Sequence, residues 1–159
     1  RDEALVLGLG ETAEVVARAT LLFEEFVARE AQAGRFAATF APLAQPLLLH
    51  GHCHQKAFGA MGAVQQALAL IPDLQVMTIE SGCCGMAGPF GLDARHRELS
   101  LRIGELGVLP ALRAASAATT LVADGASCRL QALDAMGREP VHLAQAMDAA
   151  MAERSRTQT

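Results

Sequence analysis

Three short apolar segments, each followed by a helix-like segment, constrain the fold of this chain more than any other feature. The apolar segments are residues 47–53 (LLLHGHC), 74–84 (LQVMTIESGCC) and 119–128 (TTLVADGASC). The helical patterns that follow them cover residues 55–71, 93–115 and 128–136. Strands that alternate with helices form parallel sheets, because right-handed crossovers join neighbouring parallel strands. The sequence therefore predicts an α/β fold: a small open parallel sheet of three or four strands, flanked by helices in a Rossmann-like three-layer arrangement.

The segments on either side of this core extend the prediction. Apolar residues recur at helical spacing over residues 11–33, which predicts one long N-terminal helix. Residues 139–143 (EPVHL) are a candidate last strand, and a terminal helix is expected up to about residue 153. A chain of 159 residues suits one core, so we expect a single domain over residues 1–153 and a disordered tail over 154–159. Because the chain opens within a charged stretch, we also expect it to be a C-terminal fragment of a longer chain.

Composition excludes two classes of partner. The net charge is −4, and the 13 Lys and Arg residues form no basic stripe that would attract a phosphate backbone. The longest apolar runs fall far short of the roughly 20 residues that a membrane-spanning helix needs. We therefore expect no nucleic-acid partner and no transmembrane segment. We expect a cytoplasmic protein that reaches the inner face of the membrane only through its partners.

The four cysteines of the chain follow the predicted strands. Cys53, the adjacent Cys83 and Cys84, and Cys128 each lie just after the carboxyl end of a strand and just before a helix. Ligands bind at this edge of an open α/β sheet, and helix N-termini favour thiolates over thiols. Adjacent cysteines rarely pair with each other, because the disulfide ring is strained. We therefore expect the four sulphurs to converge at one edge of the sheet and to bind metal.

Small residues and histidines accompany these cysteines. Glycines let the backbone turn tightly and approach a bulky group closely. We predict that the cofactor is contacted by Gly82, Gly85, Gly88 and Ser127. His50, His52 and His54 alternate around Cys53, and a hydrogen-bonded turn residue is the commonest role for any one of them, with metal ligand and proton carrier as the alternatives. Of the three, His52 and His54 are our further candidate ligands.

Three kinds of site remain open on the residues alone. Four thiolates can hold an iron-sulphur cluster of the 4Fe-4S type. Three or four cysteines with His52 or His54 can instead hold zinc, which would be structural or regulatory because zinc has no redox chemistry. Without metal, Cys83 and Cys84 would form a redox-sensing pair.

Three motifs carry a resemblance to a known family. The segments HGHCHQK (50–56), SGCCGMAGPFG (81–91) and ADGASCR (123–129) together resemble the cysteine-rich CCG domain. This domain occurs in iron-sulphur subunits of heterodisulfide reductase, glycolate oxidase and anaerobic glycerol-3-phosphate dehydrogenase, and in the C-terminal region of bacterial FAD-linked oxidases. The chain departs from the full pattern at one point: the pattern ends in Cys-x-x-Cys, whereas Cys128 stands alone. This departure argues against a five-cysteine, non-cubane cluster.

The resemblance implies a function for the whole enzyme. It implies that Cys53, Cys83, Cys84 and Cys128 bind an iron-sulphur cluster and pass electrons from reduced FAD to an acceptor. It also implies flavin-binding and ferredoxin-like partner domains, and a 2-hydroxy acid substrate such as glycolate, D-lactate or D-2-hydroxyglutarate. The chain itself has no G-x-G-x-x-G loop after a strand, so we expect FAD elsewhere in the full-length protein and no catalysis by this domain alone.

Overall fold

The computed structural model describes residues 5–152 and contains a three-stranded parallel sheet. The strands are β1 (Pro46–His50), β2 (Gln75–Thr78) and β3 (Thr120–Ala123), in the order β2-β1-β3. In the register, Leu48 of the central strand is level with Met77 of β2 and Leu121 of β3. The predicted α/β class and small parallel sheet are confirmed. The expected tail at 154–159 lies outside the described residues.

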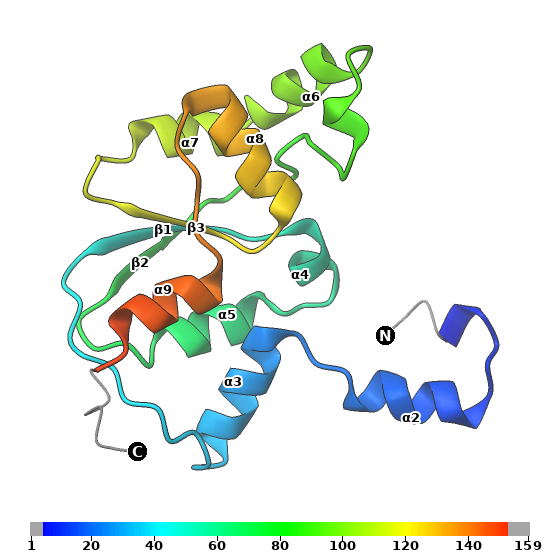
Figure 1. Ribbon diagram of the computed structural model, residues 1–159, viewed down its shortest axis with the longest axis vertical. Coiled ribbons are helices and arrows are strands. Elements are labelled where there is room, and N and C mark those ends of the chain that lie inside the picture. Colours follow the sequence, from blue (N-terminus) through cyan, green and yellow to red (C-terminus); the bar gives the residue numbers. More distant parts are fainter. Residues whose placement is uncertain (1–4, 153–159) are drawn as a thin grey trace, which may run out of the picture.

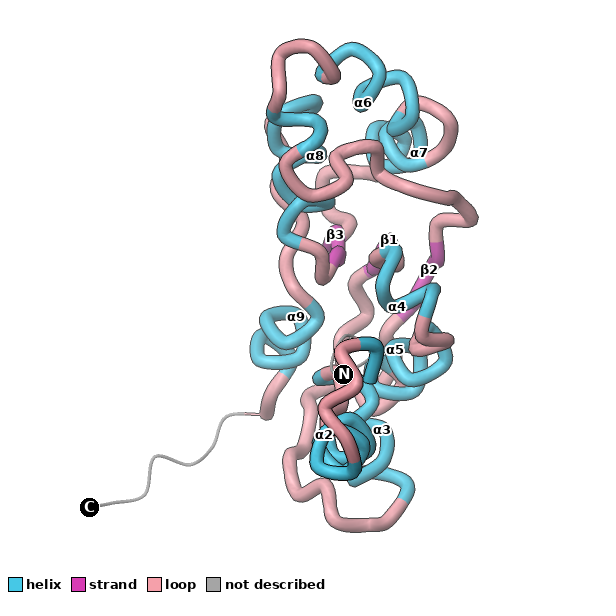
Figure 2. Tube along the Cα trace, turned by 90° about the vertical axis from the view of Figure 1, so that its right-hand side faces the viewer, coloured by secondary structure: helices cyan, strands magenta, loops and turns pink. Residues whose placement is uncertain are grey.

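Helices cover both faces of the sheet, as the three-layer prediction requires. One layer contains α3 (Phe23–Gln32), α5 (Met61–Leu68) and α9 (Leu143–Ala150). The other contains α6 (Arg97–Gly104), α7 (Val108–Ala114) and α8 (Ala126–Met136). Figure 1 shows the two layers on opposite sides of the sheet, and Figure 2 shows the strands running between them. The short helix α4 (Cys53–Ala57) follows β1, and a single 3-10 turn, η1 (Phe90–Leu92), precedes α6.

Strand alternation divides the core into two clusters. Leu47 and Leu49 of β1 pack with α3, α5 and α9, whereas Leu48 packs on the opposite face with α7 and α8. Successive side chains of a strand point to opposite faces, so each face of β1 contributes to one cluster. The central strand is thereby buried on both sides, which explains why its sequence is continuously apolar.

The prediction of one long N-terminal helix over residues 11–33 is wrong, because this region forms two separate helices. The first, α2 (Glu11–Ala19), ends where Thr20 adopts an extended backbone and its hydroxyl donates to the Val16 carbonyl oxygen at 2.8 Å. The second helix, α3, restarts at Phe23, where the Glu25 carboxylate accepts from the N–H of Leu22 at 2.8 Å. Helix α2 projects away from the sheet (Figure 1).

Other expected segments are shorter than predicted. The expected strand at 139–143 is reduced to one parallel bridge between Val141 and Val122, because Pro140 has no N–H and α9 begins at Leu143. The helical patterns at 55–71 and 93–115 are each divided in two, α4 with α5 and α6 with α7. Gly137, with a φ of 68°, caps the end of α8. Within residues 5–152, no helix is both long and apolar enough to cross a membrane.

The central strand should dominate stability. Replacing Leu49, which is 0 % exposed, with Ala is expected to lower the free energy of unfolding by about 2–5 kcal/mol, because a buried cavity replaces its side chain. The matched control is Leu106→Ala at a position 86 % exposed, where the change should stay below about 0.5 kcal/mol. Urea denaturation measures both, and equal losses would contradict the assigned core.

Candidate metal centre

The four cysteines lie in the segments that follow the three strands, at the carboxyl edge of the sheet. Cys53 is the first residue of α4, Cys83 and Cys84 lie in the loop after β2, and Cys128 lies in the first turn of α8. All four are free cysteines, not joined in disulfides. Cys83 contributes to a raised pKa of Cys53, and the Sγ atoms of Cys84 and Cys128 lie within 4.8 Å of each other. All four cysteines thus lie at this edge of the sheet, whereas the group of donors within 4.8 Å of one another in the described residues contains only Cys84 and Cys128 of the four. Binding of one metal group by all four sulphurs stays a prediction.

Strand order explains why this edge can hold a ligand. The segment after β1 runs to α5 on one face of the sheet, and the segment after β3 runs to α8 on the other. Neighbouring strands whose connections leave to opposite faces leave a crevice between them, which is where open α/β sheets bind ligands. Cys53 and Cys128 lie on the two sides of this point.

Burial divides the cysteines into an inner and an outer pair. The inner pair, Cys84 and Cys128, is 2 % and 3 % exposed and belongs to the apolar cluster beneath α7 and α8. The outer pair, Cys53 and Cys83, is half-buried. The site therefore has a closed apolar side and a side that is accessible to solvent.

His50 joins the inner pair, whereas His52 and His54 were the histidines predicted as candidate ligands. A ring nitrogen of His50 and the Sγ atoms of Cys84 and Cys128 lie within 4.8 Å of one another. Imidazole nitrogen and thiolate sulphur are the donors that zinc and related metals prefer. These three buried side chains can therefore hold a metal ion.

The two histidines proposed from the sequence lie differently. His52 is half-buried and packs against Gly125, where an added Cβ would lie 2.1 Å from the His52 ring. Burial lowers the pKa of His52, and His54 adds to this effect. His54 is exposed, with its ring 5.0 Å from that of His52. Neither belongs to a group of three close donors in the described part of the chain.

The inner pair shares one proton. The pKa of Cys84 is lowered to about 4, first by a hydrogen bond from the Cys128 thiol and then by the His50 ring and the backbone N–H of Met86. The same hydrogen bond, together with burial, raises the pKa of Cys128. Cys84 is therefore a thiolate at neutral pH and Cys128 a thiol. A site that already holds one thiolate is suited to a cation.

Backbone contacts fix the loop that carries the doublet. The N–H of Gly85 donates to Cys83 Sγ at 3.2 Å, and Gln131 Nε2 donates to the Cys84 carbonyl oxygen at 3.2 Å. Lys56 Nζ donates to the carbonyl oxygens of Ser81 and Gly82, and its charge lowers the pKa of Cys53, against the stronger raising effects of burial and Cys83. These contacts hold both sulphurs of the doublet in place.

The predicted cofactor contacts differ in their surroundings. Gly85 has a φ of 95°, and an added Cβ would lie 2.0 Å from the Ser100 carbonyl oxygen, so this position requires glycine. Gly88 also has a positive φ but is exposed, and Gly82 has open space around it. Ser127 is half-buried beside Cys128 in the first turn of α8. Contact of these residues with a cofactor stays a prediction.

A network of polar side chains joins the elements next to the site. Gln55 accepts from the N–H of His52 at 2.9 Å and donates to Glu24 Oε1 at 2.8 Å and to Asp124. Asp124 in turn accepts from the N–H of Leu143 at 2.7 Å. The network joins α3, α4, the end of β3 and α9, so the segments that carry Cys53 and Cys128 are tied to the same support.

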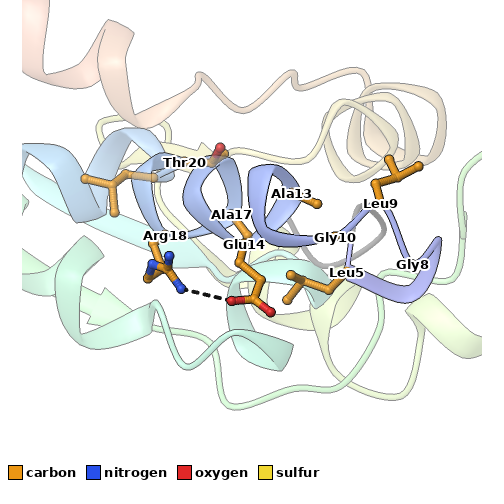
Figure 3. A pocket seen from close by; sticks show the side chains of 10 residues that line it. Leu5, Gly8, Leu9, Gly10, Ala13, Glu14, Ala17, Arg18 and Thr20 are labelled. Atoms are coloured by element: carbon orange, nitrogen blue, oxygen red, sulfur yellow. Dashed lines mark hydrogen bonds and ion pairs between the residues drawn. The ribbon is translucent and has the colours of Figure 1, made fainter.

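A pocket of about 850 Å³ lies apart from the cysteines, along the N-terminal segment. Figure 3 shows that its lining comes from α2 and the residues on either side of this helix. Its charged side chains, Glu14 and Arg18, are paired with each other at 3.4 Å. The described residues that line it include no cysteine or histidine, so this pocket is separate from the metal centre.

Comparison with known proteins does not add a family assignment. No family model matches the chain, and no solved structure matches it at a significant level. The function is therefore inferred from the geometry of the cysteines and from the sequence motifs that contain them.

The loop that carries Cys83 and Cys84 should be sensitive to substitution of Gly85 and tolerant of substitution of Gly82. Gly85→Ala is expected to destabilise the protein by about 1–3 kcal/mol, because of its positive φ and the clash with the Ser100 carbonyl oxygen. Gly82→Ala is the matched control, with nothing within 4 Å of the added Cβ. Thermal unfolding with thiol titration of the folded protein measures both changes. Equal tolerance at the two glycines would show that the loop is not constrained as described.

The shared proton of the inner pair can be titrated. In the reduced, metal-free protein, the ultraviolet absorbance of one thiolate should persist at neutral pH and disappear as the pH falls through about 4. Cys128→Ala should raise the pKa of Cys84, because it removes the hydrogen bond that lowers it most. Cys53→Ala is the control and should leave this titration in place. Absence of thiolate at neutral pH would contradict the assigned proton sharing.

Proposed function

We propose that this chain is the iron-sulphur domain of a flavin-dependent 2-hydroxy acid oxidoreductase and passes electrons from reduced FAD to an acceptor. The observation that carries the proposal is the meeting of four free cysteines, from three separate strand ends, at the switch point of the sheet. Four sulphurs at one place match the ligand number of a cubane cluster. The hydroxy acid and the flavin partner rest on the resemblance of the three cysteine motifs to the CCG domain.

The donor set fits such a cluster chemically. Cys84 is already ionised, and the backbone N–H groups of Gly85 and Met86 donate to the two sulphurs of the doublet. Hydrogen bonds to cluster sulphurs are one of the means by which proteins set a reduction potential. When bound, the cluster would supply one-electron transfer. The ligands would be Cys53, Cys83, Cys84 and Cys128.

The half-buried outer pair suits electron exchange with a partner. Cys53 and Cys83 are the sulphurs accessible from outside, whereas Cys84 and Cys128 are enclosed by apolar side chains. A partner domain carrying FAD can therefore approach the outer pair while the inner pair stays shielded from water. Because the chain has no nucleotide-binding loop of the G-x-G-x-x-G type, the flavin belongs to that partner.

A structural zinc site is the second candidate. It is favoured by one observation, the close approach of His50 to Cys84 and Cys128, because nitrogen and sulphur donors together are typical of zinc. Zinc carries no electrons, so the two functions differ in whether sulphide and a reducible centre are present.

Reconstitution tests the proposal. Anaerobic protein supplied with ferrous iron and sulphide should bind about four irons and four sulphides per chain and show a paramagnetic signal after reduction. Cys83→Ser should lower the iron content and change the signal, because serine binds iron poorly. Ala94→Ser, at an exposed position after the same loop, is the control. Binding of zinc without any uptake of sulphide would overturn the electron-transfer function and favour the structural one.

A further inference from the structure

We propose that His50 is a metal ligand through Nε2, so that the inner part of the site is a mixed nitrogen and sulphur donor set of His50, Cys84 and Cys128. The inference deepens the proposed function and rests on it for the identity of the resident group. In a four-iron cluster, which takes four protein ligands, His50 would replace one of the outer cysteines, Cys53 or Cys83. With a single divalent ion, His50 would be the third donor beside Cys84 and Cys128.

The position of His50 in the sheet places its side chain on the same face as the inner cysteines. It is the last residue of the central strand and lies on the same face as Leu48, two residues earlier. That face belongs to the cluster that contains Cys84 and Cys128. Strand alternation therefore places the His50 ring beside the inner cysteines, and its ring nitrogen lies within 4.8 Å of both sulphurs.

His50 is buried, and one of its ring nitrogens lacks a hydrogen-bond partner. The residue is 1 % exposed, and Nε2 has no hydrogen-bond partner. It is the only such buried side-chain atom among the described residues. Buried polar atoms are almost always satisfied in folded proteins, so an exception calls for an explanation such as a bound ion. A metal held with Cys84 and Cys128 would provide the missing partner.

The other ring nitrogen supports the same assignment. His50 Nδ1 lies 3.5 Å from the hydroxyl oxygen of Ser81. Histidines that bind metal through one nitrogen usually direct the other to an oxygen, which fixes the tautomer and the ring orientation. With a metal bound, a proton on Nδ1 directed at Ser81 would leave the Nε2 lone pair for the metal, in place of the stabilisation that the ring gives the Cys84 thiolate in the metal-free chain. Ser81 is thereby a positioning residue.

A mixed donor set changes the expected properties of a cluster. Imidazole ligands raise the reduction potential of iron-sulphur centres above that of all-thiolate ones. His50→Cys would restore an all-thiolate set at the same place. This variant should keep bound metal and lower the potential of a reconstituted cluster, whereas a purely structural histidine would leave the potential unchanged.

Cobalt binding tests the ligand role without any cluster. Co²⁺ added to the reduced full chain should give thiolate-to-metal absorbance. His50→Ala should weaken Co²⁺ binding about tenfold or more, because loss even of a group that only supports a ligand commonly lowers metal affinity by about that factor. Ser81→Ala should weaken it less. His54→Ala is the matched control, because that side chain is exposed, and its affinity should be unchanged. Unchanged Co²⁺ affinity in folded His50→Ala would overturn the inference.

A second measurement covers the case in which His50→Ala does not fold. X-ray absorption of the Zn²⁺-loaded wild type should show scattering from one imidazole, and the His52→Ala, His54→Ala double variant should retain it. Loss of that scattering in the double variant would assign the nitrogen ligand to His52 or His54 and overturn the inference.

The two proposals fail in different ways. A wild-type chain that binds Co²⁺ through imidazole but takes up no sulphide would refute the iron-sulphur function and support the ligand role of His50. A chain that holds a cluster, with no nitrogen ligand in either the cluster or the Co²⁺ form, would support the function and refute the role of His50.

Discussion

The divergence of the backbone after β1 and β3 is the constraint on which the rest of the structure depends. The central strand is buried on both faces, so it can be enclosed only if helices cover both sides of the sheet. With the order β2-β1-β3, the segments after the two neighbouring strands must then leave to opposite faces. The crevice that results lies where Cys53 and Cys128 begin their helices, so the site follows from the topology.

Electrostatics then decides what this crevice can hold. The Cys84 thiolate lies among apolar side chains, where an uncompensated charge would be strongly unfavourable. Its compensation comes from the Cys128 thiol, the His50 ring and one backbone N–H. A cation between Cys84 and Cys128 would replace the shared proton and allow both sulphurs to ionise. Metal binding at this place should therefore release a proton, as is general for thiolate sites.

The sequence predicts the strands and the location of the cysteines after the strand ends well, because apolar runs and strand ends are local signals. It does not predict the break between Ala19 and Phe23, since apolar residues continue in helical phase across it. It also does not single out His50 over His52 and His54, although a histidine at the end of the run PLLLH was a signal. Alternation puts this residue on the face of Leu48, but only the folded chain shows that the cysteines occupy that face and that His52 and His54 have left the strand.

The adjacent cysteines can now be explained by direction. Neighbouring side chains on an extended segment point to opposite sides, so a doublet can serve two halves of one site. Cys83 reaches the half-buried Cys53, and Cys84 reaches the buried Cys128. The chain must then turn at once to place an N–H near each sulphur, and the positive φ of Gly85 permits this turn against the Ser100 carbonyl oxygen. A single cysteine at this strand end would complete either the inner or the outer pair, and only the doublet connects the two.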